Sequence, residues 1–197
     1  MKTFDLKGTL RSELGKKATK QVRRDESVPC VIYGSGEPIH FVGNEKEYGK
    51  IIYTPNSYQI NLDIDGTVYP VILKAIQFHP VTDRLLHLDF MRITEGKPVN
   101  ISIPVRLEGF AKGVQQGGKL KLEMRRVNVK GMISNLPDEL VLDVTNVEVG
   151  QTIKVRDLTY ADFEITNPKS EVIASVRTTR ATKGTEEAAA AAPEAKA

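Results

Sequence analysis

The sequence has one cysteine, Cys30, among its 197 residues, and this excludes a disulfide framework and a cysteine-based zinc cluster. Long apolar runs are also missing, since no stretch approaches the roughly 18–20 residues that span a membrane. Residues 1–10 lack the apolar core of a signal peptide, so we expect a soluble cytoplasmic protein without a membrane partner. Hydrophobic residues nevertheless make up 40% of the chain, which excludes a wholly disordered protein.

The usual phosphate-binding and catalytic signatures are missing as well. The sequence has no P-loop, no dinucleotide-binding glycine pattern after a strand and no nucleophile elbow. The segment Gly34-Ser-Gly36 follows a predicted strand, but it lacks a third glycine and a helix start, so it indicates a turn. No set of metal ligands with suitable spacing is visible. We therefore expect neither a cofactor nor a metal ion.

The net charge is small, +3, but the charge is unevenly distributed. Residues 1–25 contain eight basic and three acidic residues, a net charge of +5, so the rest of the chain carries −2. The basic residues are densest between Arg11 and Arg24. Such a cluster can neutralise several phosphates and release their counterions, or it can be an ordinary solvated loop. The cluster by itself does not decide between these two interpretations.

Alternation of apolar and polar residues is the main local pattern up to residue 94, and it predicts short strands. We expect strands at 4–10, 28–33, 39–42, 58–64, 67–78 and 85–93. Asp65-Gly66 predicts a tight hairpin turn between two of these strands. Asn44 is a candidate helix cap, because an apolar stripe that includes Tyr48 and Ile51 follows it.

Thr94–Pro98 has the composition of a linker, and the strand pattern starts afresh after it. Short strands separated by Gly, Pro and Asp turns then indicate an all-β second domain. The segment at 180–197 has no large apolar residue, so we expect a disordered tail. The predicted organisation is a first domain at 1–94, a second domain at 95–179 and the tail. The strands expected in the second domain are 99–107, 119–129, 140–144, 152–155 and 171–176.

His87 and Asp89 lie two residues apart, so a strand would place both side chains on one face. Leu86, Leu88 and Phe90 would then share the opposite face. The pair could be catalytic, could bind a metal, or could offer hydrogen-bonding groups to a polar partner; a merely exposed strand face also fits. Catalysis would need a nearby nucleophile, and the chain has a single thiol.

Tyr33 ends an apolar strand just before Gly34. A tyrosine in this position usually packs at the core or at its rim. Its hydroxyl group and ring could instead contact a nucleotide.

Four segments carry a further signal when they are taken together. They are Leu10-Arg-Ser-Glu-Leu-Gly-Lys16, Lys20-Gln-Val-Arg-Arg24, Val28-Pro-Cys-Val-Ile-Tyr-Gly34 and Gln77-Phe-His-Pro-Val-Thr-Asp-Arg-Leu-Leu-His-Leu-Asp-Phe90. In this order and spacing, the chain resembles the L-twenty-five/CTC family of bacterial large-subunit ribosomal proteins, which bind 5S ribosomal RNA. The resemblance covers about the first 94 residues; beyond them, only position and general pattern are similar to the longer CTC form.

The resemblance implies that the first domain is a six- to seven-stranded β-barrel with one or two short helices, which binds the loop E region of 5S rRNA. It implies backbone contacts from a basic loop, contacts from strands on the barrel face, and a tight-turn glycine before the loop. The backbone contacts would come from Arg11, Lys16, Lys20 and Arg23. The contacts on the barrel face would come from Tyr33, His87 and Asp89, and the tight-turn glycine would be Gly15. Lys20 and Gln21 stand where the family often has two arginines, and lysine lacks the planar fork of arginine.

The sequence therefore predicts a mainly β structural constituent of the large ribosomal subunit, located on the ribosome in the cytoplasm and monomeric when free. Its expected partner is 5S rRNA, and neighbouring rRNA or proteins of the subunit are further candidates. We expect no enzyme activity, and we expect the basic loop to become ordered on the RNA. Two alternatives stay open: a non-ribosomal module related to synthetase anticodon-binding domains, and a hydrolase that uses His87 and Asp89.

Overall fold

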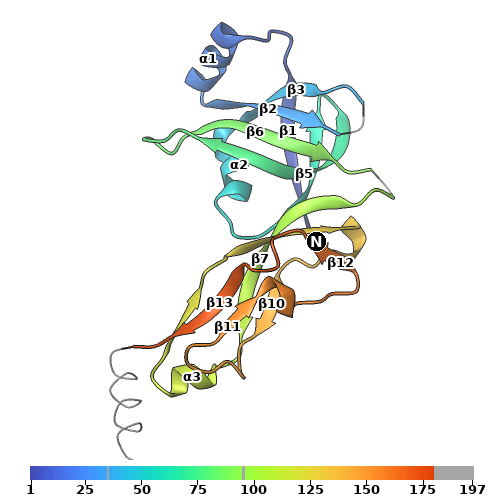
Figure 1. The fold of residues 1–197 in the computed structure, drawn as a ribbon. Helices are drawn as coiled ribbons and strands as arrows, with labels where there is room; N and C mark the ends of the chain where they lie inside the picture. The colour runs from blue at the N-terminus through green and yellow to red at the C-terminus, as the bar shows by residue number, and fades with distance from the viewer. Residues whose placement is uncertain (35, 95, 180–197) are drawn as a thin grey trace, which may run out of the picture. The chain divides into compact units, whose positions relative to one another are not determined.

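The computed structural model describes residues 1–34, 36–94 and 96–179, so the predicted disordered tail lies outside the described residues. The chain packs as two units, each of which is described by itself. The first unit comprises Met1–Ile101 and Lys130–Asp138. The second comprises Ser102–Val129 and the described residues from Glu139 onward. Both units are built mainly from β-strands (Figure 1), which confirms the predicted fold class.

A closed six-stranded barrel forms the first unit. Its strands are β1 (Lys2–Leu10), β2 (Ser27–Tyr33), β3 (Ile39–Asn44), β4 (Tyr58–Ile64), β5 (Thr67–Phe78) and β6 (Leu85–Arg92). The order around the barrel is β1-β3-β2-β6-β5-β4, and β1 closes it by pairing in parallel with β4. The β2–β6 pair is also parallel, whereas the other neighbours are antiparallel. Because the barrel is closed, none of these strands leaves a long unpaired edge.

Three aromatic rings fill the barrel interior. Phe41, Tyr48 and Phe90 are at most 1% exposed, and their ring centroids lie 5.8–6.5 Å apart. Aromatic pairs at this separation and tilt add attraction to the burial of their apolar surface. Gly43 makes room for this cluster, because a Cβ atom there would collide with the ring of Tyr48.

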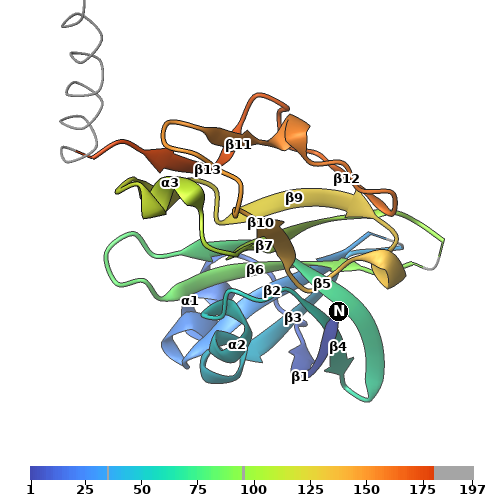
Figure 2. The same ribbon diagram turned by 90° about the horizontal axis from the view of Figure 1, so that it is seen from below.

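The helix that supplies Tyr48 is α2 (Glu45–Ile52), which packs against the barrel (Figures 1 and 2). Asn44 caps it, since its side-chain oxygen accepts a hydrogen bond of 3.0 Å from the backbone N–H of Lys46. Tyr48 and Ile51 are buried in the barrel core. The cap and the apolar stripe predicted from the sequence are both confirmed.

The basic segment forms a helix, α1 (Lys16–Arg24), and not the predicted loop. None of its residues is buried, and it lies outside the barrel next to β2 (Figure 1). Neither a side-chain cap nor an acidic residue in its first turn supports it. Seven of its nine residues are nevertheless Ala, Lys, Gln or Arg, which are good helix formers, and Arg23 and Arg24 in the last turn suit the helix dipole.

The second unit contains a four-stranded and a three-stranded sheet. The strands are β7 (Val99–Glu108), β8 (Lys119–Leu122), β9 (Arg126–Gly131), β10 (Leu140–Asp143), β11 (Thr152–Lys154), β12 (Phe163–Ile165) and β13 (Val172–Arg177). The sheet orders are β10-β7-β9-β12 and β11-β13-β8, with the first residues of β7 and the last of β9 belonging to the first unit. The helices of this unit are α3 (Lys112–Gln115) and the 3₁₀ helix η2 (Val155–Asp157), whereas the 3₁₀ helix η1 (Ile133–Asn135) belongs to the first unit. No helix among the described residues is long and apolar enough to cross a membrane.

The strand predicted at 119–129 is wrong in one respect: the segment forms two strands in different sheets. The backbone N–H groups of Glu123 and Met124 both point to the carbonyl of Ile173, so the chain turns between β8 and β9. A change of parity in the sequence coincides with this break. Apolar residues occupy even positions up to Met124 and odd positions from Val127 onward, as a continuous strand would not allow.

Candidate nucleic-acid interface

Helix α1 begins directly after Gly15, whose φ of 123° lies in the region that favours glycine. This fits the tight turn predicted before the basic segment. Ala18 and Val22 are half-buried, so this side of the helix faces the barrel. The side of α1 that carries most of its charge therefore faces solvent.

Lys16, Lys20 and Arg24 are exposed and lie four residues apart, so they form one row along α1. We call this row the α1 stripe. Within the described residues, none of the three side chains has a hydrogen-bond or ion-pair partner. Like charges four residues apart disfavour a helix by about 0.2–0.5 kcal/mol per pair. An anion bound along the stripe would remove this repulsion.

Arg24 was not among the predicted contact residues. A helical period starting from Lys20 points to Arg24, whereas the predicted loop has no such period. Lys17 is exposed as well, and it adds positive charge next to the positive end of the helix dipole.

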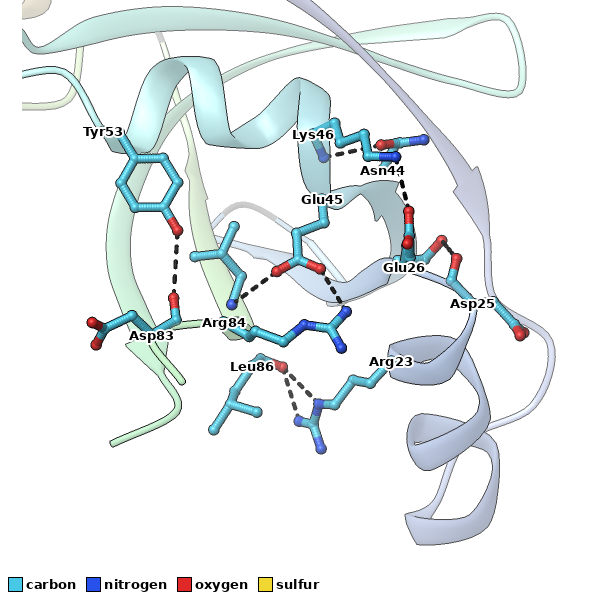
Figure 3. Close-up of polar contacts among 12 residues, drawn as sticks. Arg23, Asp25, Glu26, Asn44, Glu45, Lys46, Tyr53, Asp83, Arg84 and Leu86 are labelled. Carbon is cyan, nitrogen blue, oxygen red and sulfur yellow. Dashed lines mark hydrogen bonds and ion pairs between the residues drawn. The ribbon is translucent and has the colours of Figure 1, made fainter. Parts of the chain in front are cut away.

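Two other predicted contact residues use their guanidinium groups within the protein. Nη2 of Arg11 donates to the carbonyl of Glu13 and to Oγ1 of Thr19, both at 3.2 Å. Nε and Nη2 of Arg23 donate to the carbonyl of Leu86, at 3.0 and 2.8 Å (Figure 3). These two arginines therefore link α1 to the chain around it.

The predicted strand pair is present on β6. Nδ1 of His87 lies 2.7 Å from Oδ1 of Asp89, and both side chains are about one-quarter exposed, at 28% and 27%. This Nδ1 atom is shielded from solvent and makes no hydrogen bond of regular geometry within the described residues, although the Asp89 carboxylate lies beside it. A carboxylate in this position favours a proton on Nδ1, so Nε2 is the ring nitrogen left for a ligand.

Neighbouring strands extend this polar face. Gln77 of β5 lies opposite His87, and Ala75 lies opposite Asp89; both are exposed. On the other side of β6, Asp89 aligns with Val31 of β2. Gln77 was not among the predicted site residues, because the sequence does not show which residue of one strand lies opposite another.

Tyr33 lies at the end of β2 and is 37% exposed. Burial, and then the nearby carboxylate of Asp89, raise the pKa of Tyr33 above its ordinary value. The hydroxyl therefore stays protonated at neutral pH and can donate a hydrogen bond. The structure thus brings Tyr33 together with the His87–Asp89 pair on one face of the barrel.

One expectation about β6 is wrong. Leu88 and Phe90 are buried as predicted, but the third core residue is Leu85, at 3% exposure, and Leu86 is half-buried. A β-bulge causes this, since Gln77 pairs with His87 while Phe78 pairs with Leu85. Leu86 is the extra residue, and it shifts the alternation by one position.

The hydrolase alternative would need a nucleophile near His87 and Asp89, and the thiol of Cys30 does not lie on this face. Cys30 aligns with Leu88, is 1% exposed and lies in the barrel core, whereas His87 and Asp89 lie on the outer face. Burial raises the pKa of the Cys30 thiol far above its ordinary value, so it is a poor nucleophile. Across residues 1–34, 36–94 and 96–179, no group of three or more His, Cys, Asp or Glu side chains could hold a metal ion.

Comparisons with known proteins identify matches over nearly the whole chain. The model of the Ribosomal L25p family matches residues 6–90, and that of "Ribosomal protein TL5, C-terminal domain" matches residues 98–180. The Large ribosomal subunit protein bL25 of Azobacteroides pseudotrichonymphae is 49% identical over 186 residues, which cover 94% of this chain and 98% of that protein. The protein of the same name from Phocaeicola vulgatus is 45% identical over 191 residues, with coverages of 93% and 96%. The one from Bacteroides thetaiotaomicron is 43% identical over 197 residues, with coverages of 98% and 99%.

Proposed function

Since this chain belongs to the ribosomal L25p family, we propose that it is a structural constituent of the large ribosomal subunit and that its barrel unit binds 5S rRNA. The relatives are named as proteins of the large subunit, which supports the first part and a location on the ribosome in the cytoplasm. The second part rests on the resemblance of the N-terminal segments. The observation that supports the proposal best is that α1 carries a row of cationic side chains without protein partners and lies next to a polar barrel face.

The α1 stripe supplies affinity in this proposal. Its three cationic side chains project into solvent and can follow a phosphate backbone, and each neutralised phosphate releases counterions. These contacts carry no sequence information, but they set the register and orientation of the RNA. We therefore assign the proposed backbone contacts to Lys16, Lys20 and Arg24, with Gly15 as the turn before them. Arg11 and Arg23, which the sequence also predicted as contacts, instead hold α1 to the rest of the unit.

The barrel face supplies discrimination. A-form RNA presents a wide, shallow minor groove with 2′-hydroxyl groups and base edges, which rigid strand side chains can test. The hydroxyl of Tyr33 can donate to this surface, and Nε2 of His87 can accept from it. The Asp89 carboxylate is unfavourable near phosphates, but it orients His87 and can accept a hydrogen bond from a base amino group or a 2′-hydroxyl.

The remaining parts of the proposal concern the whole chain. The RNA-binding domain is the segment at 1–94, and the domain at 95–179 takes no part in this contact. The protein is monomeric when free and has no catalytic function. These statements leave neighbouring rRNA or proteins of the large subunit as candidate partners of the second domain.

The salt dependence of binding tests the proposal. We expect the full chain to bind 5S rRNA and, with the three phosphate contacts of the α1 stripe on the scale of duplex DNA, to lose about fortyfold in affinity between 50 and 200 mM salt. Filter binding or fluorescence anisotropy would measure this, with a transfer RNA as the control. An affinity that does not change with salt would contradict the electrostatic part, and equal affinity for both RNAs would contradict a 5S-specific site.

Asp89→Ala should mainly reduce discrimination between 5S rRNA and a variant with altered loop E. One well-formed polar contact contributes about 1–3 kcal/mol of discrimination, so the ratio of the two affinities should fall about tenfold. Lys20→Ala is the matched comparison, since it should weaken binding to both RNAs by the same factor. If Asp89→Ala weakened both RNAs equally and Lys20→Ala changed the ratio, the two roles would be reversed.

A further inference from the structure

The start of β6 has an irregular backbone. Leu86 is the bulged residue, so it has no partner in the ladder between β5 and β6. The ladder between β2 and β6 begins only at Cys30 and Leu88, directly after Pro29, which has no N–H to donate. Leu86 therefore lies outside both ladders, and its carbonyl oxygen accepts both hydrogen bonds from Arg23.

The two residues before Leu86 are held from another helix. Oε2 of Glu45, the first residue of α2, lies 2.9 Å from Nη2 of Arg84, and Oε1 accepts a hydrogen bond of 3.3 Å from the N–H of Leu85 (Figure 3). This side chain is 22% exposed, so the ion pair is partly shielded. Three consecutive residues, Arg84 just before β6 and Leu85 and Leu86 at its start, are thus each held by a side chain from a helix.

The ends of the two helices are also joined to each other. The N–H of Glu45 donates to the carbonyl of Glu26, just after the end of α1, at 3.1 Å. Nζ of Lys46 lies 3.0 Å from Oε2 of Glu26 (Figure 3). The end of α1, the start of α2 and the start of β6 therefore each contact the other two, and Arg23 makes the contact between α1 and β6.

Arg23 and Arg24 have opposite environments although they are neighbours in sequence. The Arg23 guanidinium binds a backbone carbonyl 63 residues away in the chain. Arg24 is exposed, and its side chain has no hydrogen-bond or ion-pair partner in the described parts of the chain. The same side-chain chemistry is thus used for attachment in one case and left free for a ligand in the other.

We propose that Arg23 is a positioning residue. It fixes α1 to the start of β6, and it thereby determines the position of the α1 stripe relative to the His87–Asp89 pair. Leu86, which accepts the bonds, directly precedes His87, so the attachment point adjoins the polar barrel face. Arg11 supports the helix from its other half through Thr19. The proposal rests on the proposed function for the identity of the ligand, but the attachment itself is a property of the free protein.

Hydrogen exchange of the α1 amides in the free full-length protein tests the attachment. Arg23→Ala should raise their exchange rates about tenfold, because a pair of charge-assisted hydrogen bonds is lost. Arg23→Lys should have nearly the same effect, since an ammonium group cannot reproduce the two donors of the planar fork. Arg24→Ala is the matched control and should leave these rates within about twofold, with exchange in β4 reporting an intact barrel in each variant.

Binding to 5S rRNA then separates positioning from direct contact. If Arg23 acts by holding α1, Arg23→Lys should weaken binding nearly as much as Arg23→Ala, although the charge is retained. A direct phosphate contact would tolerate lysine, so wild-type affinity of Arg23→Lys would overturn the proposal, as would unchanged exchange in Arg23→Ala. If the wild-type protein did not bind 5S rRNA, the proposed function would fail, and the exchange experiment would still decide the attachment.

Discussion

Replacing the α1 stripe with glutamine, in the variant Lys16→Gln/Lys20→Gln/Arg24→Gln, should weaken binding to 5S rRNA about 100- to 1,000-fold at 0.1 M salt. On the scale of duplex DNA, each lost phosphate contact makes the plot of log affinity against log salt concentration less steep by about 0.9. Each unit of this slope corresponds to about a tenfold difference in affinity between 0.1 M and 1 M salt. Glutamine is a good helix former and removes the repulsion along the stripe. The helix should therefore remain, and binding isotherms at several salt concentrations would measure both the affinity and the slope.

The matched control removes the same charge from exposed lysines of the second unit, in Lys112→Gln/Lys119→Gln/Lys169→Gln. At 0.1 M salt the Debye length is about 10 Å, so charges that do not contact the RNA should change its affinity only a few-fold. An equal loss in both triple variants would show that net charge, and not the stripe, drives binding. A larger loss in the control would place the RNA site in the second unit.

Phe90→Ala should lower the free energy of unfolding of the barrel by about 3–5 kcal/mol, which is the usual cost of removing a buried aromatic side chain. Phe90 is 1% exposed, and its ring centroid lies 5.8 Å from that of Phe41 and 6.1 Å from that of Tyr48. Because a domain is typically stable by about 5–15 kcal/mol, this single change removes a large part of the total. Denaturant titration followed by barrel NMR signals would measure it.

Phe78→Ala is the matched control, since it removes the same side chain from a position that is 42% exposed. Its ring centroid lies 6.3 Å from that of Tyr53, and because the side chain is largely exposed we expect a loss of about 1 kcal/mol or less. Equal losses for the two variants would contradict the assignment of the core.

Local patterns in the sequence predict most of the barrel. The hairpin turn is one example: Asp65 and Gly66 adopt φ values of 49° and 89°, as the type I′ turn predicted from this dipeptide requires. The α2 helix is another, since both its cap at Asn44 and its buried stripe are readable from residues close together in the chain. Family membership was also evident, because the order of four short segments is itself a sequence property.

The basic segment shows where such prediction stops. Its cationic residues repel one another and Gly15 has no side chain to cap a helix, which favours a solvated loop, whereas its Ala, Lys, Gln and Arg residues are good helix formers. The segment is helical, and two contacts attach it to the rest of the unit: Arg11 binds Thr19, and Arg23 binds Leu86. The division of the cationic residues into attached arginines and a free stripe follows from these contacts, and a count of charges does not show it.

The sequence by itself determined the mainly β class, the individual barrel strands, the uneven placement of charge and the pairing of His87 with Asp89 on one strand face. Each of these depends on residues that are near one another in the chain, where a period of two or a turn dipeptide is visible. Only the tertiary structure decided that Leu85 and not Leu86 is in the core, that Gln77 lies opposite His87, and that Arg23 attaches α1 to β6. The physical reason is that strand register, a bulge and a bond between residues 63 positions apart depend on how distant segments pack.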